Sequence, residues 1–321
     1  MRRAGLALLA LLVLLGTSVA AAQPRVHRIG VVLLGGPGAQ SIDGLRDGLR
    51  ELGFEEGKQY AFLVRDAKGD RKAAGVAAKG LEADGVDVIF AVGSSVTFTV
   101  MEATKTVPIV FHTGADPAEV GLVETFRKPG GRLTGVGSQS RDLGPKRLEL
   151  LKEIVPSARR VVGFYNPDNP TRNAVPALRE AARRLKIQLI ERQVRSVAEL
   201  NAGLRALRHE DADAIFYIGD SMVSSQAQAV VEAGLAKRLP TMFHDSGTVM
   251  MGALASYGVS FRAIGHQTAK YVHRILLGAR PGDLPVELVD RIYLAINLKT
   301  AKAIGVTIPQ AVLTRADEVI Q

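Results

Sequence analysis

A chain of 321 residues is long for one compact domain and suits two. Its 47% hydrophobic and 23% charged residues exclude intrinsic disorder, and the lack of cysteine excludes disulfides, thiolate catalysis and Cys-ligated metal centres. The formal net charge of +9 comes from lysines and arginines scattered among acids, so a solvated surface is favoured over a nucleic-acid interface.

The N-terminal segment predicts a cleaved secretory signal. Arg2 and Arg3 are followed by an apolar run over residues 6–19 and by three alanines that end at Ala22. We expect cleavage after Ala22, which lowers the net charge to +7. A retained membrane anchor is the alternative, but the run is short, and no later stretch approaches about 20 unbroken apolar residues. Because no cysteine follows to carry a lipid, we expect a free periplasmic protein.

Apolar periodicity then alternates between strand and helix. The first half predicts strands over residues 28–34, 60–65, 86–92, 107–112 and 133–136, and helices over 42–52, 71–83 and 96–105. Continuous apolar strands separated by helices are typical of a parallel sheet covered on both faces.

The pattern restarts after the turn-rich residues 127–131. It predicts helices over 145–155, 172–185, 197–207 and 223–237, and strands over 161–165, 187–192, 214–218 and 241–244. The tail adds strands at 253–257 and 292–296 and helices at 263–277 and 298–304.

We therefore predict an α/β fold of two doubly wound parallel-sheet lobes joined by a multi-crossover hinge. The signal takes residues 1–22, lobe 1 residues 23–138 and lobe 2 residues 139–261. Part of 262–288 returns to lobe 1, and a strand and helix in 289–321 complete the lobes.

The two halves match in detail. Residues 86–94 (VDVIFAVGS) parallel residues 212–220 (ADAIFYIGD), and residues 107–113 (VPIVFHT) parallel residues 239–245 (LPTMFHD). Both halves have the order strand, Gly-polar loop, helix, X-Pro, strand and His-polar loop. Two such matches in the same order indicate two similar lobes in tandem.

Ligands of open parallel sheets collect at the carboxyl ends of the strands, where helix N-termini present free N–H groups. Two matched lobes would turn these loops towards one cleft. The candidate ligand residues are Gly36, Gly93, Ser94, Ser95, Thr113, Asp220, Ser221 and Asp245.

The matched loops differ in charge. Thr113 and the serines after Gly93 offer hydroxyl and N–H donors that suit a carboxylate, whereas Asp220 and Asp245 offer acceptors at the matching positions. An amino acid needs both kinds of group. Helix capping is the alternative role for the serines and for both aspartates.

Metal, cofactor and catalytic sites are not expected. His112 and His244 lack metal-ligand spacing, so we expect them to be packed or hydrogen-bonded structurally. The chain has no Gly-x-Ser-x-Gly elbow, no phosphate-binding loop and no His-Glu-x-x-His motif. Residues 35–38 (GGPG) are not a dinucleotide fingerprint, although Asp66 lies near the position of its acidic residue.

Several motifs resemble the tryptophan-binding-like family of ABC transporter substrate-binding proteins. They are residues 91–95 (AVGSS), 107–111 (VPIVF), 115–117 (ADP), 121–123 (GLV), 133–136 (LTGV), 296–305 (INLKTAKAIG), 308–309 (IP) and 315–320 (RADEVI). The resemblance covers essentially the whole mature chain. It implies a type I periplasmic-binding-protein fold with three crossovers and a ligand buried by hinge closure.

The resemblance also implies roles by position. Residues 93–95 and Thr113 match loops that hold a carboxylate, and Asp220 stands where an acid that binds an ammonium group is expected. The chain departs from the amino-acid-binding pattern at residues 35–40 and 217–221.

We therefore expect a monomeric periplasmic binding protein that delivers an amino acid or related carboxylate to an inner-membrane ABC permease. A sensory module that reports to a kinase or chemoreceptor is the main alternative, and a kinase encoded nearby would favour it. A lactose-repressor-type regulator would carry a helix-turn-helix where this chain has its signal. An enzyme is disfavoured because no activated nucleophile or acid–base pair stands out.

Overall fold

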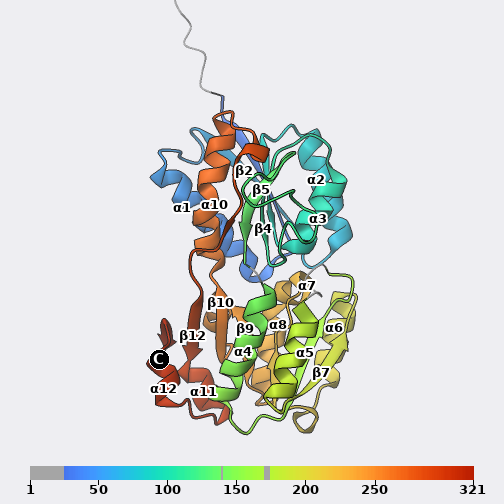
Figure 1. The fold of residues 1–321 in the computed structure, drawn as a ribbon, viewed down its shortest axis with the longest axis vertical. Coiled ribbons are helices and arrows are strands. Elements are labelled where there is room, and N and C mark those ends of the chain that lie inside the picture. The colour runs from blue at the N-terminus through green and yellow to red at the C-terminus, as the bar shows by residue number, and fades with distance from the viewer. Residues whose placement is uncertain (1–24, 139, 170–173) are drawn as a thin grey trace, which may run out of the picture.

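The computed structural model describes residues 25–138, 140–169 and 174–321. The predicted signal and its cleavage site lie outside the described residues. Within the described part, two sheets flanked by helices are stacked along the long axis of the molecule (Figure 1). The predicted two-lobed α/β fold is therefore confirmed. No helix in these ranges combines the length and apolarity needed to cross a membrane.

The first sheet has the strand order β11-β5-β4-β3-β1-β2, and all its described pairs are parallel. Its strands are β1 (His27–Leu33), β2 (Tyr60–Asp66), β3 (Val88–Val92), β4 (Ile109–Thr113), β5 (Leu133–Gly137) and β11 (Glu287–Leu288). Its helices are α1 (Gln40–Glu51), α2 (Arg71–Ala83), α3 (Ser94–Ala103) and α10 (Phe261–Leu276).

Alternate strand residues face two separate cores. Val31 and Phe90 pack with α1 and α10 on one face, whereas Val32 and Ile89 pack with α2 and α3 on the other. Burial on both faces explains why the central strands are continuously apolar.

The second sheet has the order β13-β12-β10-β9-β8-β6-β7. Its strands are β6 (Arg160–Tyr165), β7 (Gln188–Gln193), β8 (Ala214–Phe216), β9 (Thr241–Asp245), β10 (Ala255–Val259), β12 (Tyr293–Asn297) and β13 (Glu318–Ile320). The helices of this lobe are α4 (Ser140–Ile154), α5 (Val175–Arg184), α6 (Val197–Ala206), α7 (Ser221–Ser225), α8 (Ala227–Ala236), α9 (Gly247–Met250), α11 (Leu298–Ile304) and α12 (Gln310–Leu313).

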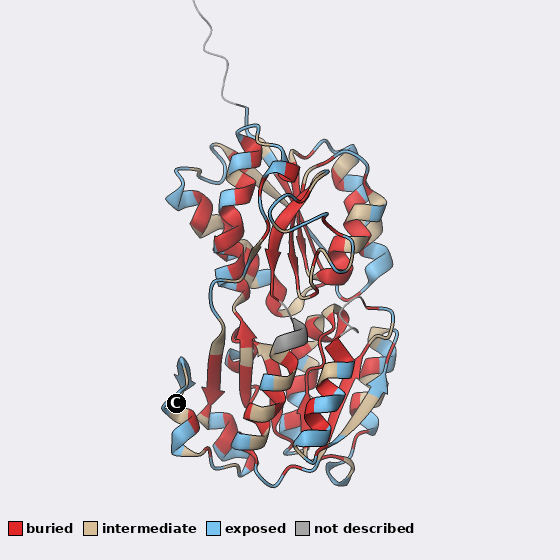
Figure 2. Cartoon of the chain, viewed as in Figure 1, coloured by how far each residue is buried: buried red, intermediate tan, exposed pale blue. Residues whose placement is uncertain are grey.

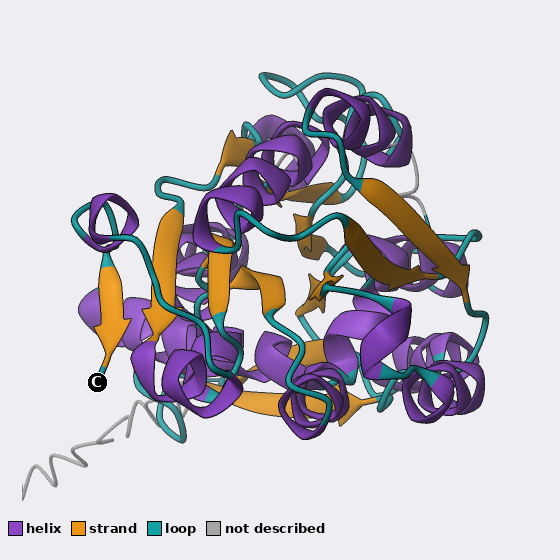
Figure 3. Cartoon of the chain, turned by 90° about the horizontal axis from the view of Figure 1, so that it is seen from below, coloured by secondary structure: helices purple, strands orange, loops and turns teal. Residues whose placement is uncertain are grey.

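The order β9-β8-β6-β7 repeats the order β4-β3-β1-β2 of the first sheet, which confirms the tandem lobes that the matched segments predicted. In the view along the long axis, helices lie on both sides of the strands (Figure 3). One pair differs from the prediction of parallel strands, because β12 runs antiparallel to β10.

The described chain passes between the lobes three times. It leaves β5 for α4, returns from β10 to α10, and crosses again between β11 and β12. Each lobe is therefore assembled from stretches of chain that are far apart in the sequence, and the three connections form a hinge.

Helices α1 and α10 lie side by side in the first lobe, although more than 200 residues separate them (Figure 1). Their backbones touch where glycines replace side chains. A Cβ atom on Gly44 would overlap the carbonyl oxygen of Arg262, and one on Gly265 would overlap that of Ser41. This close approach packs α10, which follows the crossover from the second lobe, against α1 of the first lobe.

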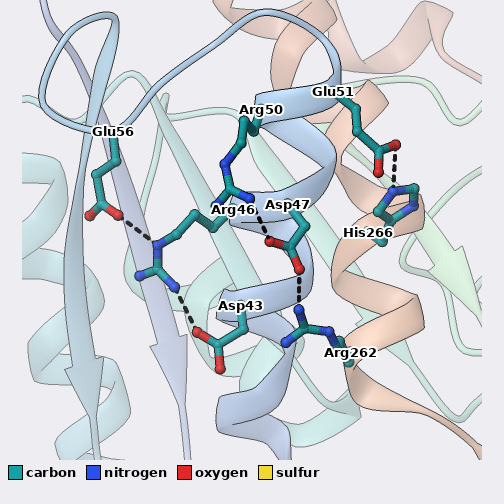
Figure 4. A network of polar contacts seen from close by, with 8 residues as sticks. All are labelled: Asp43, Arg46, Asp47, Arg50, Glu51, Glu56, Arg262 and His266. Carbon is teal, nitrogen blue, oxygen red and sulfur yellow. Dashed lines mark hydrogen bonds and ion pairs between the residues drawn. The ribbon is translucent and has the colours of Figure 1, made fainter.

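Charged side chains line the outer side of this helix pair (Figure 4). Asp47 pairs with Arg262, and Glu51 lies 2.8 Å from Nε2 of His266. Because these groups are partly exposed, each pair contributes at most about 1 kcal/mol. Backbone packing, rather than the ion pairs, therefore holds α1 against α10.

Two predicted helices differ clearly from the structure. Helix α4 begins at Ser140 and contains Pro145, which was expected to open it; an internal proline sacrifices one backbone hydrogen bond. The helix predicted over 223–237 is divided at Gln226, whose backbone lies outside the helical region. Just before the break, the hydroxyl of Ser225 donates to the carbonyl oxygen of Met222. The predicted start of α5 falls partly outside the described residues. The short elements β11, α9, α12 and β13 were not predicted.

Candidate functional site

The carboxyl ends of strands from both lobes meet at a small cavity. It encloses about 50 Å³, enough for a few water molecules. Residues around the junction of the lobes are largely buried (Figure 2). The cavity is lined by Leu33, Leu34, Gly35, Gly38, Val92, Gly93, Ser94, His112, Gly114, Ser138, Tyr217, Gly219, Asp220, Ser221, Ser224, His244 and Phe261.

The lobes touch through glycines with positive φ. Gly36 has φ +64°, and a Cβ there would lie 2.5 Å from the carbonyl oxygen of Ser224 in the other lobe. Gly93 has φ +104°, and its Cβ would lie 3.0 Å from Oγ of Ser221. The structure therefore describes a closed arrangement in which Gly36 contacts the opposite lobe rather than the cavity.

Two candidate hydroxyls of the first lobe form one buried pair. Ser94, at the start of α3, has its Oγ 2.8 Å from Oγ1 of Thr113 at the end of β4. Ser94 Oγ also accepts from the backbone N–H of Gly114 at 3.0 Å. Ser94 lines the cavity, and Thr113 supports it from behind. Ser95 instead faces an outer groove.

Asp220 lies across the cavity and caps α7. Its Oδ1 accepts from Val223 N at 2.9 Å, and its Oδ2 accepts from Asn166 N at 3.0 Å. The backbone of Met222 and the side chain of Asn169 also donate to the carboxylate, while burial raises its pKa. The capping role is therefore observed, and a ligand contact stays a prediction. Neighbouring Ser221 lines the cavity.

Asp245 fixes the crossover into α10 and does not line the cavity. Its carboxylate accepts from Thr248 N and Phe261 N, both at 3.2 Å, and from Gly247 N. The side chain is fully buried, and burial raises its pKa to about 7. This arrangement supports a structural role at the hinge.

Aromatic rings make a cavity wall that the sequence did not predict. Tyr217 and His244 are stacked with centroids 3.9 Å apart, and Phe261 meets His244 and His112 edge-on at 5.8 and 5.6 Å. The matched His-polar loops were a signal for both histidines. Tyr217 and Phe261 carried no pattern that distinguishes them from core residues.

The two histidines are neutral and incompletely hydrogen-bonded. Burial lowers the pKa of His112 to about 4 and that of His244 well below 6.5. Both ring nitrogens of His112 and Nδ1 of His244 have no hydrogen-bond partner among the described residues. Both histidines line the cavity, and these three nitrogens are buried. In the described ranges, no three His, Asp or Glu side chains are grouped to hold a metal.

A wider groove of about 990 Å³ lies next to the cavity, and Leu34 and Asp220 line both. It runs between α2 and α3 of the first lobe and the loops before α6 and α7 of the second. The groove therefore lies at the same junction of the lobes as the cavity.

Two tandem α/β lobes, three crossovers and a cavity at matched strand ends define a type I periplasmic-binding-protein fold. The chain belongs to the family described as ABC transporter substrate binding protein, whose model matches residues 29–320.

Three relatives extend this assignment. The tyrosine-binding protein of Clostridioides difficile (strain R20291) is 27% identical over 258 residues, which is 80% of this chain and 74% of that protein. An ABC domain from Streptococcus pneumonia in complex with L-Trp is 26% identical, with a TM-score of 0.81 over 92% of this chain and 100% of that one. A ligand-free, open substrate-binding protein with adhesive properties from Clostridium difficile is 27% identical over the same shares, with a TM-score of 0.60.

The two structural comparisons have nearly equal identity but different TM-scores. Sequence distance therefore does not explain the difference. As a whole, this structure is more similar to the L-Trp complex than to the open, ligand-free protein, in agreement with the small cavity and the contacts of Gly36.

Proposed function

We propose that the chain is the periplasmic solute-binding component of an ABC importer, without catalytic activity. It captures a small polar ligand, an amino acid or a related carboxylate, and delivers it to a permease in the inner membrane. The observation that carries this proposal is the meeting of matched strand-end loops from both lobes over one buried cavity.

Capture follows from the geometry of the hinge. A ligand that contacts both lobes makes its full set of contacts only when the lobes are closed, so binding shifts the population towards the closed form. The cavity of about 50 Å³ is smaller than an amino acid, so entry requires the lobes to separate and then to close around the ligand. A permease that recognises the closed form would then receive loaded protein.

The cavity wall supports a ligand with both polar and apolar parts. Ser94, Ser221 and backbone groups after Gly93 would hold polar atoms, and the rings of Tyr217 and Phe261 would pack against an apolar body. Tyrosine and L-Trp, for which two of the relatives are named, each have a polar and an apolar part. The predicted signal at residues 1–22 supports export to the periplasm.

A thermal-shift screen of residues 23–321 tests the proposal. The panel contains amino acids, aliphatic and aromatic acids, and uncharged sugars as a comparison. A true ligand raises the melting temperature with its concentration, because at 100 times Kd it adds about 2.7 kcal/mol to the stability. If no compound shifts the transition, the proposal of a small-molecule binding protein fails. Loss of uptake of the identified ligand after deletion of the gene would support the import role.

A further inference from the structure

Two histidines at matched positions of the lobes line the same cavity. His112 is the last residue but one of β4, and His244 is the last residue but one of β9. Both rings meet the ring of Phe261 edge-on, with centroid distances of 5.6 and 5.8 Å. Phe261 therefore bridges the two imidazoles, and a ligand between the lobes can approach one imidazole from each lobe.

The nitrogens of these rings lack hydrogen-bond partners although they are buried. Among the described residues, six buried side-chain nitrogen and oxygen atoms have no partner. Three of them are Nδ1 and Nε2 of His112 and Nδ1 of His244, and the other three belong to residues that do not line the cavity. Native proteins contain few such atoms, because an unpaired buried polar atom lowers stability. Their concentration at the cavity indicates that a bound molecule completes these hydrogen bonds.

Three neighbouring polar side chains on the cavity wall are already hydrogen-bonded within the protein. Ser94 Oγ lies 2.8 Å from Thr113 Oγ1 and accepts from Gly114 N at 3.0 Å. The hydroxyl of Tyr217 accepts from the backbone N–H of Asp220 at 2.7 Å and donates to its carbonyl oxygen at 3.0 Å. The carboxylate of Asp220 caps α7. The imidazole nitrogens differ from these groups because no described residue engages them.

The charges around the cavity favour an uncharged ligand group at the imidazoles. Burial lowers the pKa of both rings, so at neutral pH each ring is neutral and has one N–H donor and one acceptor nitrogen. Among the described residues that line the cavity, Asp220 is the one charged side chain, and no lysine or arginine is present to balance a carboxylate beside the rings. A hydroxyl or a heterocyclic N–H can bond to a neutral imidazole without burying a further charge.

We propose that His112 and His244 bind the ligand as a pair, one from each lobe, through hydrogen bonds to uncharged polar groups such as a hydroxyl or the N–H of a heterocycle. The inference rests on the proposed function and specifies how the cavity selects its ligand. It gives both histidines a binding role in place of the structural role that the sequence predicted. A ligand bonded to one ring of each lobe completes its contacts only in the closed form.

Calorimetry on single variants measures the contribution of each ring. The probes are L-tyrosine, L-tryptophan and the most tightly bound compound of the thermal-shift panel. His112→Leu and His244→Leu, which remove the ring nitrogens, are each expected to weaken binding about tenfold. Glutamine at either position keeps one donor and one acceptor, so it should restore part of the affinity.

His27→Leu is the matched control. Nδ1 of His27 is also buried without a partner, but this residue begins β1, at the edge of the sheet opposite to the cavity. The substitution therefore changes the same type of side chain in the same lobe and should leave the affinity for all probes unchanged.

Matched analogues test the ligand group. L-phenylalanine lacks the hydroxyl of L-tyrosine, and 1-methyl-L-tryptophan lacks the indole N–H of L-tryptophan. For any other bound compound, the analogue has hydrogen in place of its hydroxyl. We expect the missing group to weaken binding about tenfold in the unmodified protein, and much less in the leucine variant of the ring that it contacts.

Nuclear magnetic resonance of the unmodified protein gives a readout that does not depend on the folding of a variant. The six histidines are labelled with nitrogen-15, and the signals of His112 and His244 are assigned by their contacts with Phe261. We expect the bound compound to shift the ring-nitrogen signals of both residues, with both rings neutral, and to leave those of His27 unchanged. If a leucine variant does not fold, these spectra and the glutamine variants decide.

The outcomes separate the two proposals. Unchanged affinity of both leucine variants, or unchanged signals of His112 and His244 on binding, overturns the inference and leaves the ring nitrogens to water. An effect at one ring alone overturns the pairing. Protonation of either ring in the complex overturns the choice of an uncharged group, as does a panel in which only compounds without such a group bind.

In all of these cases the proposed function stands, because the protein still binds a small molecule. A protein that binds nothing in the whole panel overturns the proposed function, and the inference with it.

Discussion

Replacing Gly36 with alanine separates lobe closure from the folding of either lobe. A Cβ atom at this position would lie 2.5 Å from the carbonyl oxygen of Ser224 and 2.9 Å from Cα of Ser225, both in the opposite lobe. These overlaps exist only when the lobes are together. The substitution therefore raises the free energy of the closed form and leaves the open form free of the clash.

The size of the effect follows from two separate costs. Forcing a methyl group into packed backbone costs about 1–3 kcal/mol, which corresponds to a loss of ligand affinity of roughly 5- to 150-fold. The positive φ of +64° costs alanine about 1 kcal/mol more, but in the open and closed forms alike. The second cost lowers stability without changing affinity.

Gly53→Ala is the matched control. Gly53 has φ +84° and no atom within 4 Å of an added Cβ, so this variant bears the backbone cost alone. Calorimetry with the tightest-binding compound of the panel should show weakened binding for Gly36→Ala and unchanged binding for Gly53→Ala. Thermal unfolding without ligand should show similar losses in both. Equal affinities of the two variants would refute the closed geometry as the binding form.

Three further predictions follow from the same structure. Asp220→Ala should weaken ligand binding about tenfold or more in calorimetry, and removal of its cap should cost about 1 kcal/mol in a thermal melt; full affinity would remove Asp220 from the site. Gly44→Ala should lower the free energy of unfolding by about 1–3 kcal/mol or more, because its Cβ would overlap the carbonyl oxygen of Arg262. Gly80→Ala, at an exposed position of α2 with open space around it, should raise the free energy of unfolding by up to about 1 kcal/mol. Urea titrations that show equal effects of the two substitutions would contradict this packing. The pKa of His112 is lowered from 6.5 to about 4, so between these pH values the unfolded chain binds more protons than the folded chain. Through His112, acidification from pH 6.5 to pH 4 should therefore lower the free energy of unfolding by about 3 kcal/mol. His112→Gln should reduce the acid-induced loss by about 2 kcal/mol in urea titrations at pH 7 and pH 4.5, while the share of His244 remains. An unchanged loss would show that His112 does not titrate as a buried neutral ring.

The sequence predicted the fold well because the strongest signals were long and periodic. Continuous apolar strands and amphipathic helices specified the two sheets, and the matched segments 86–94 and 212–220 predicted their common topology. Short elements escaped prediction. Strand β11 has two residues and β13 three, which is too few to show a period, and their pairing is decided by distant strands.

The candidate site was predicted only in part. Strand-end position identified Ser94, Thr113 and Asp220, which the structure brings to one region, but it did not show that the hydrogen bonds of Asp220 are already engaged. Arg147 lies on a helix whose sequence gives no sign that its side chain is buried. Such a feature depends on tertiary contacts, and local patterns do not contain it.

A crystal structure of residues 23–321 with the tightest-binding compound of the panel would test most directly whether the ligand is held between the lobes. We predict ligand density in the cavity bounded by Ser94, Asp220 and Phe261, in contact with strand-end loops of both lobes. A ligand bound on the outer surface of one lobe, with the space between the lobes empty, would contradict this prediction.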